Sequence, residues 1–267
     1  MKIDKRVGAE ASIEDLKDGA SVVIGGWGPF RKPMEIVRCI ARSSVKDLTV
    51  LSFAGMDLDL LIGAGKVKTA IFGFVSFEGA PGGPNNFKRA RQEGTVEMKE
   101  LSEYMFITQF KAAAERLPFY PTRSGMGTDI LTINPEIKTI KDPYSDEILV
   151  AVPAFTPDYA IIHVNESDQL GNARISADPY LDGLFVRAAN KVIVSAERIV
   201  PTGKIQENSI SSCWVDMVVQ APKGAYPGDC YPDYGITEKE FKRYGDASKD
   251  PDSFQKYLNE VLKEDNS

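Results

Sequence analysis

The stretch Val22-Val23-Ile24-Gly25-Gly26-Trp27-Gly28-Pro29-Phe30-Arg31-Lys32-Pro33 decides the fold of this chain. Its apolar start, Val22 to Ile24, is typical of a buried strand. Three glycines within the next four positions predict a tight turn, because glycine tolerates a positive φ and close approach of other atoms. Pro33 suits the first turn of a helix, where its missing N–H costs least. The stretch therefore predicts a strand, a glycine turn and the start of a helix.

A turn of this kind can direct backbone N–H groups toward a ligand, because it opens the N-terminus of a helix. The alternative is a tight strand-to-helix turn that binds nothing. The glycine spacing does not match the G-x-G-x-x-G dinucleotide fingerprint, and no acidic residue follows at the distance which that motif requires. A dinucleotide cofactor is therefore not predicted.

Apolar runs and helical patterns alternate on both sides of this stretch. Strands are predicted at 48–53, 67–74, 95–101, 147–152, 159–164, 191–196 and 215–220, and helices at 33–41, 58–62, 87–93, 102–117 and 181–189. Residues 123–134 hold two glycines and no clear period, so a loop is predicted there. The alternation predicts an α/β fold in which helices cover both faces of a mostly parallel sheet. We expect one domain over residues 1–267, with a helical tail from about residue 237.

Composition narrows the class of protein. The apolar content of 43% is ordinary for a globular chain, and the net charge of −6 argues against a nucleic-acid partner. The sequence has no run of about 18 apolar residues, so no membrane span is predicted. Its first residues lack the apolar core of a signal peptide. The cysteines Cys39, Cys213 and Cys230 are few and far apart, which favours reduced thiols and a cytoplasmic location. With a single histidine, His163, no His-rich metal site is expected, and we predict no metal.

Short blocks spread along the chain together resemble the A subunits of class I coenzyme A transferases of the glutaconate type. They are Gly25-Gly26-Trp27, Arg31-Lys32-Pro33, Asp57-Leu58-Asp59-Leu60, Ala112-Ala113-Ala114, Val150-Ala151-Val152-Pro153, Asp168-Gln169-Leu170-Gly171-Asn172 and Ala221-Pro222-Lys223-Gly224. The resemblance covers about residues 12–235. It implies a CoA thioester as substrate, no bound cofactor and a B-subunit partner, with an α2β2 assembly expected.

The resemblance also implies roles for the glycine turn. Family members form the active site between two subunits, and the nucleophilic glutamate of the transferases lies in the B subunit, in a motif absent from this chain. Carried over, the oxyanion site and the acyl pocket fall on Gly25, Gly26, Trp27 and Gly28. Preorganised N–H donors would stabilise the charge that develops on the thioester carbonyl oxygen. The partner glutamate would attack the acyl-CoA and form a covalent intermediate.

Glu103 opens a second chemistry. It lies in the first turn of the helix predicted after Ser102, where an acidic side chain favours the helix dipole, and this structural role is one interpretation. The chain also resembles a branch of the family that hydrolyses carbon–carbon bonds in cyclic acyl-CoA compounds of steroid catabolism. That likeness rests on Gly26-Trp27-Gly28, Lys32-Pro33-Met34, Phe72-Gly73-Phe74-Val75-Ser76 and Glu103. In that branch Glu103 would act as the base.

Four further residues are predicted to bind substrate: Arg31, Phe74, Ser76 and Arg123. Arg31 and Lys32 would meet CoA phosphates or remain solvated, and Arg123 would contact a substrate carboxylate or the partner, or lie in a surface turn. The loop Gly79–Asn86 is expected to border the acyl pocket. His163 is interpreted as a structural histidine. A non-catalytic α/β ligand-binding subunit remains the alternative from another class.

Overall fold

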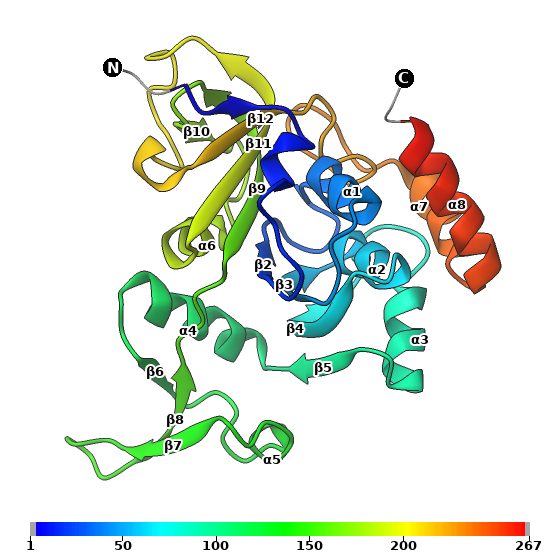
Figure 1. Cartoon of the computed structure of the whole chain (residues 1–267). Coiled ribbons are helices and arrows are strands. Elements are labelled where there is room, and N and C mark those ends of the chain that lie inside the picture. The colour runs from blue at the N-terminus through cyan, green and yellow to red at the C-terminus, as the bar shows by residue number, and fades with distance from the viewer. Residues whose placement is uncertain (1–3, 265–267) are drawn as a thin grey trace.

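The computed structural model describes residues 4–264, and a mostly parallel sheet runs through them (Figure 1). Its main path is β1-β12-β11-β9-β2-β3-β4-β5, in which every neighbouring pair is parallel. These strands span Arg6–Val7, Met217–Gln220, Lys191–Val200, Tyr159–Asp168, Ser21–Ile24, Leu48–Ala54, Val67–Val75 and Glu97–Glu100 in that order. The short β10 (Ala173–Arg174) pairs antiparallel with β9.

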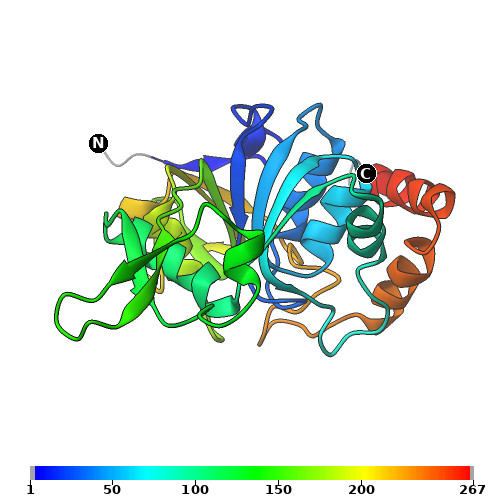
Figure 2. The ribbon, with the colours of Figure 1, turned by 90° about the horizontal axis from the view of Figure 1, so that it is seen from below.

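Helices cover both faces of this sheet, which confirms the predicted fold class (Figures 1 and 2). One face carries α1 (Met34–Arg42), α2 (Met56–Gly63), α3 (Asn85–Glu93), α7 (Glu238–Ala247) and α8 (Pro251–Glu264). The other face carries α4 (Glu103–Ala114) and α6 (Asp182–Ala188). Residues on successive strand positions separate into two cores, with Val22 and Ile24 in one and Val23 in the other. Burial on both faces explains why the strands read as continuous apolar runs.

A second, smaller sheet projects from this body (Figure 1). Its strands β6 (Phe119–Thr122), β8 (Ile148–Pro153) and β7 (Lys138–Lys141) pair antiparallel in the order β6-β8-β7. Residues 123–134, predicted as a loop, contain the short helix α5 (Ile130–Ile133), so that prediction is wrong over these four residues. Residues 119–153 form what we call the arm.

The C-terminal helices α7 and α8 occupy the segment for which a helical tail is predicted, and they pack on the core. Tyr244 of α7 is buried and donates to Asp59 of α2, and Asp59 also accepts from the Phe87 amide. The side chain of Asn85 donates to the Gly245 carbonyl of α7 at 3.0 Å. Residues 82–86, of which Asn85 and Asn86 belong to α3 and not to a loop, therefore pack on the tail, which corrects the expectation that this part of the predicted loop borders the acyl pocket.

No helix among residues 4–264 is both long enough and apolar enough to cross a bilayer.

Candidate active site

The glycine turn joins β2 to α1 as the sequence predicts. Gly26 adopts φ +74°, and a Cβ atom there would lie 2.3 Å from the Phe30 carbonyl oxygen. The turn closes through two backbone bonds, from the Trp27 amide to the Phe30 carbonyl at 3.0 Å and from the Phe30 amide to the Trp27 carbonyl at 2.8 Å. Only glycine meets both the conformation and the close approach at position 26.

The four amides assigned to an oxyanion site are already hydrogen-bonded inside the chain. The Gly25 amide donates to the Ile161 carbonyl oxygen, and the Gly26 amide donates to the Asp182 carboxylate, both at 2.9 Å. The Trp27 amide donates to the Phe30 carbonyl oxygen at 3.0 Å, and the Gly28 amide to that of Phe53 at 3.1 Å. This corrects the expectation that these N–H groups face a ligand. The physical reason is that the turn is wedged between β9, β3 and α6, which together with the turn's own Phe30 provide an acceptor for each donor.

Arg31 and Lys32 are buried, so neither is the solvated surface cation that one interpretation expected. Arg31 pairs with Asp182 at 2.8 Å, and its guanidinium also donates to the carbonyl oxygens of His163 and Asp178. Lys32 donates to Ser52 at 2.8 Å and lies 3.2 Å from Asp57. Burial lowers the pKa of Lys32, although Asp57 opposes this shift. Engaged in this way, the two cations hold the turn in place and do not reach out to a CoA phosphate.

Four aromatic rings form a row at the carboxyl ends of β2, β3 and β4. Trp27 stacks on Phe53 with ring centroids 4.4 Å apart and meets Phe74 at 4.9 Å. Trp27 also stacks on Tyr180, with ring centroids 5.8 Å apart and an interplanar angle of 23°. Phe53 is fully buried beneath the row, whereas the other three rings are partly exposed. We call Trp27, Phe53, Phe74 and Tyr180 the aromatic row.

Glu103 begins α4 beside this row. Ser102 caps the helix by accepting from the Met105 amide at 3.2 Å, as the sequence predicts. A Cβ atom on Gly73, the neighbour of Phe74, would lie 3.0 Å from the Phe53 ring and 3.1 Å from the Glu103 Cα. The Glu103 side chain is exposed and makes no hydrogen bond or ion pair with residues 4–264. The absence of a side chain at Gly73 thus brings the start of α4 against the aromatic row.

The other two predicted substrate-binding residues lie close to these elements. Ser76 follows β4, is half-buried, and its carbonyl oxygen lies 3.7 Å from where a Cβ on Gly28 would be. Arg123 belongs to the arm and is exposed, with two bonds of 2.6 Å to the carboxylate of Glu147. Its neighbour Ser124 shares a hydrogen bond of 2.7 Å with Ser102. The arm therefore touches the start of α4, one residue away from Glu103.

His163 is buried, and both of its ring nitrogens are engaged, by Ser195 at 2.9 Å and by Glu197 at 2.8 Å. Burial opposes charge on Glu197, but hydrogen bonds from His163, Tyr234 and the Lys223 amide outweigh it and hold its pKa below the usual range. The ligand atoms of His163, Glu197 and Cys230 lie within 4.8 Å of one another, as in a metal site. Because both carboxylate oxygens already accept protein donors, we assign the cluster a structural role, consistent with the interpretation of His163.

The sequence missed Asp182 and Tyr180, although they complete the site. Asp182 begins α6 and binds both Gly26 and Arg31. Tyr180 has φ +48°, which is rare for an aromatic residue. In the sequence Asp182 has the pattern of an ordinary acidic residue in the first turn of a helix. No residue near Tyr180 indicates a left-handed conformation, so no local signal identified either residue.

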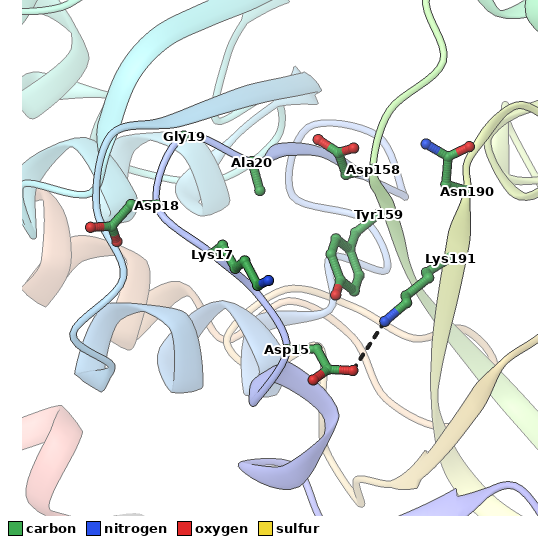
Figure 3. Close-up of a pocket in the computed structure, with 9 residues that line it drawn as sticks. All are labelled: Asp15, Lys17, Asp18, Gly19, Ala20, Asp158, Tyr159, Asn190 and Lys191. Carbon is green, nitrogen blue, oxygen red and sulfur yellow. Dashed lines mark hydrogen bonds and ion pairs between the residues drawn. The ribbon is translucent and has the colours of Figure 1, made fainter.

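A wide hollow lies at the opposite edge of the sheet, where β2, β9 and β11 begin (Figure 3). Its volume is about 550 Å³, and its lining includes Asp15, Lys17, Asp158, Tyr159 and Lys191. Lys191 pairs with Asp15 at 3.1 Å across it, as the dashed line in Figure 3 marks. None of the predicted site residues lines this hollow.

Comparison with known proteins agrees with this architecture. The coenzyme A transferase family model matches residues 7–221, so the chain belongs to the coenzyme A transferase family. The chain is 40% identical to the cholesterol ring-cleaving hydrolase IpdA subunit of Rhodococcus jostii, over 96% of this chain and 91% of that protein. It is 31% identical to the A subunit of glutaconate CoA-transferase from Acidaminococcus fermentans, over 94% of this chain and 85% of that protein.

Solved structures show the same relationship. The crystal structure of glutaconate coenzyme A-transferase from Acidaminococcus fermentans superposes with a TM-score of 0.91 at 30% identity, covering 97% of this chain and 88% of that one. A variant of the decarboxylase AibA/AibB superposes with a TM-score of 0.90 at 27% identity, covering 98% and 100%. These findings confirm the family resemblance and identify the chain as similar to A subunits along nearly its whole length.

Proposed function

We propose that this chain is the A subunit of a heteromeric enzyme that acts on acyl-CoA thioesters, with the acyl group bound at the carboxyl edge of the sheet. The observation that carries the proposal is Glu103, an exposed acidic residue that begins α4 where this helix packs against the aromatic row. A carboxylate without a protein partner is available for chemistry, and partly exposed rings offer apolar contact to an acyl group. The thioester is the substrate, and no cofactor is assigned to this chain.

The site is completed by a B subunit. The row and Glu103 lie at an edge that this chain leaves partly open, and relatives of this chain are named as subunits. An α2β2 assembly follows if each A–B pair associates with a second pair. The free thiols Cys39, Cys213 and Cys230 support a cytoplasmic location for the complex.

The first chemistry is CoA transfer between carboxylic acids. A glutamate that the B subunit supplies attacks the thioester carbonyl carbon and expels CoA thiolate, and this chain holds the acyl group against Trp27 and Phe74. Gly25, Gly26 and Gly28 then shape the acyl pocket through the rigid turn, since their own amides are hydrogen-bonded elsewhere. In this chemistry Glu103 is not required.

The second chemistry is hydrolytic ring opening of a cyclic acyl-CoA, with Glu103 as the base. One observation favours it: Glu103 is exposed beside the row and has no partner among residues 4–264. The carboxylate takes a proton from water or from the substrate, and water supplies the atoms added when the carbon–carbon bond breaks. Arg123 and Ser76 are proposed to orient the substrate near this carboxylate.

Both chemistries are tested on the complex co-purified with its B subunit. An acyl-CoA panel that includes cyclic β-keto thioesters is incubated with and without acceptor carboxylates, and products are identified by mass spectrometry. The variant is Glu103→Ala, and the matched control is Glu115→Ala, an exposed acid at the opposite end of α4.

The outcomes separate the two chemistries. Acceptor-dependent CoA exchange that survives Glu103→Ala indicates transfer. A ring-opened water adduct that falls about 10²–10⁴-fold in Glu103→Ala, but not in Glu115→Ala, indicates hydrolysis. A complex that neither binds nor converts any acyl-CoA contradicts the proposal and favours a non-catalytic subunit for another ligand.

A further inference from the structure

Tyr180 occupies a backbone conformation that its side chain disfavours. Its φ of +48° lies in the left-handed region, where a bulky residue is a genuine outlier and glycine or asparagine is the usual occupant. Such strain persists only when the surroundings hold it, and it gathers at binding and catalytic sites. A tyrosine at this position therefore indicates that its ring has a role in the site.

The surroundings hold Tyr180 from both sides. The Tyr180 amide donates to the Asp178 carboxylate at 2.8 Å, and the Asp178 carbonyl accepts from Arg31 at 2.7 Å. On the other side Asp182 binds Arg31 and the Gly26 amide. The segment 178–182 is thus fixed to the glycine turn at two points, and the position of the Tyr180 ring is set in advance.

The Tyr180 ring joins the aromatic row through Trp27. It stacks on Trp27 and lies over the Arg31 guanidinium, with 5.4 Å from the guanidinium carbon to the ring centroid. Unlike Phe53, it is partly exposed. From Phe74 through Trp27 to Tyr180, the row thus presents adjoining aromatic groups at the edge where the acyl group is proposed to bind.

We propose that Tyr180 is a specificity-determining residue, which makes this site favour CoA thioesters whose acyl group carries a flat, apolar ring system over those with a short linear chain. The inference rests on the proposed function, because it takes the aromatic row as the acyl side of the site. A rigid row of rings gains most contact from a ligand that is itself flat, since stacked rings adopt preferred offset arrangements. A short chain covers only part of the row.

The test uses two unreactive thioethers, S-(1-naphthylmethyl)-CoA and S-butyl-CoA, so that binding is measured apart from chemistry. Their dissociation constants for the A–B complex are measured by calorimetry. Tyr180→Gly removes the ring and suits the left-handed backbone, and Tyr180→Asn is a second variant that tolerates the same conformation. Tyr180→Phe keeps the ring. Arg116→Gly is the matched control, because Arg116 is exposed beyond α4 with φ +59°.

The wild-type complex is expected to bind the naphthylmethyl thioether more tightly. Tyr180→Gly and Tyr180→Asn should reduce that preference at least tenfold, while Tyr180→Phe and Arg116→Gly keep it. An unchanged preference in a folded Tyr180→Gly or Tyr180→Asn complex, or equal weakening for both thioethers, overturns the role of Tyr180 and leaves the proposed function standing. If the wild-type complex binds neither thioether nor CoA, the proposed function fails as well.

Discussion

The carboxyl and amino ends of the strands in the central sheet, here called its carboxyl and amino edges, carry ion pairs that differ in burial. At the carboxyl edge Arg31 and Asp182 form an ion pair whose side chains are 1% and 0% exposed. At the amino edge Lys191 and Asp15 form a pair whose side chains are 44% and 79% exposed, across a hollow of about 550 Å³. The hollow thus lies where the charged side chains are solvated, and the fixed geometry lies where they are buried. Burial and pairing, not volume, single out the carboxyl edge as the candidate site.

Asp182→Ala should have the largest effect on stability. It leaves Arg31 buried without its carboxylate and the Gly26 amide without its acceptor, which costs about 3–5 kcal/mol of unfolding free energy. Chemical denaturation of the purified chain measures this loss. Asp15→Ala is the matched control at the amino edge and should leave the midpoint almost unchanged. Equal, small effects of the two substitutions would remove the contrast between the edges.

Gly26→Ala should cause the second-largest loss of stability. A methyl group there meets the Phe30 carbonyl oxygen at 2.3 Å in a left-handed conformation, and we expect a loss of about 3 kcal/mol. Gly19→Ala at the amino edge has a similar φ of +78° but open space around it, so it carries the conformational strain alone. Thermal melts of both variants separate clash from strain. If they melt together, the close packing of the glycine turn contributes nothing.

Asp59 extends the comparison to a buried carboxyl group away from both edges. Burial raises its pKa from 3.8 to about 6 in the folded chain. Between pH 4 and pH 6 Asp59 is therefore mostly deprotonated in the unfolded chain but still largely protonated in the folded chain. As pH rises through this range, the contribution of Asp59 to the free energy of unfolding falls by on the order of 2 kcal/mol.

Unfolding free energies at pH 4 and pH 6 test this sign. Asp59→Asn should flatten the pH dependence relative to wild type, whereas Asp246→Asn, at an exposed position on α7, should not. A wild-type curve that Asp59→Asn leaves unchanged would mean that burial does not perturb this carboxyl group.

Arg123→Ala should have the smallest effect on stability, because its pair with Glu147 is exposed to solvent. Its proposed contact with substrate or partner predicts instead an increase of about tenfold in KM or in the dissociation constant of the subunits. Lys141→Ala, which removes another exposed pair of the arm with Asp146, is the control. Unchanged kinetics and assembly in Arg123→Ala would leave Arg123 as a surface residue only.

The sequence predicted well what local patterns determine. The strand, glycine turn and helix at 22–42, the Ser102 cap and the parallel sheet all follow from residues close together in the chain. The burial of Arg31 could not be predicted in this way, because its partner Asp182 lies 151 positions later. For the same reason the acceptors of the Gly25 and Gly26 amides, Ile161 and Asp182, were missed. Within the arm, β8 was predicted as the strand at 147–152, whereas β7 was missed because it is fully exposed and carries no apolar alternation.

The shared carboxylate of Asp182 has an evolutionary consequence. It accepts from the Gly26 amide with one oxygen and from Arg31 with the other, so the segments around residues 25–31 and 178–182 depend on each other for their structure. A lineage that replaces Asp182 must replace Arg31 as well, or supply another buried acceptor for it. Positions 31 and 182 are therefore expected to change together among descendants of this chain, while positions 15 and 191 drift independently.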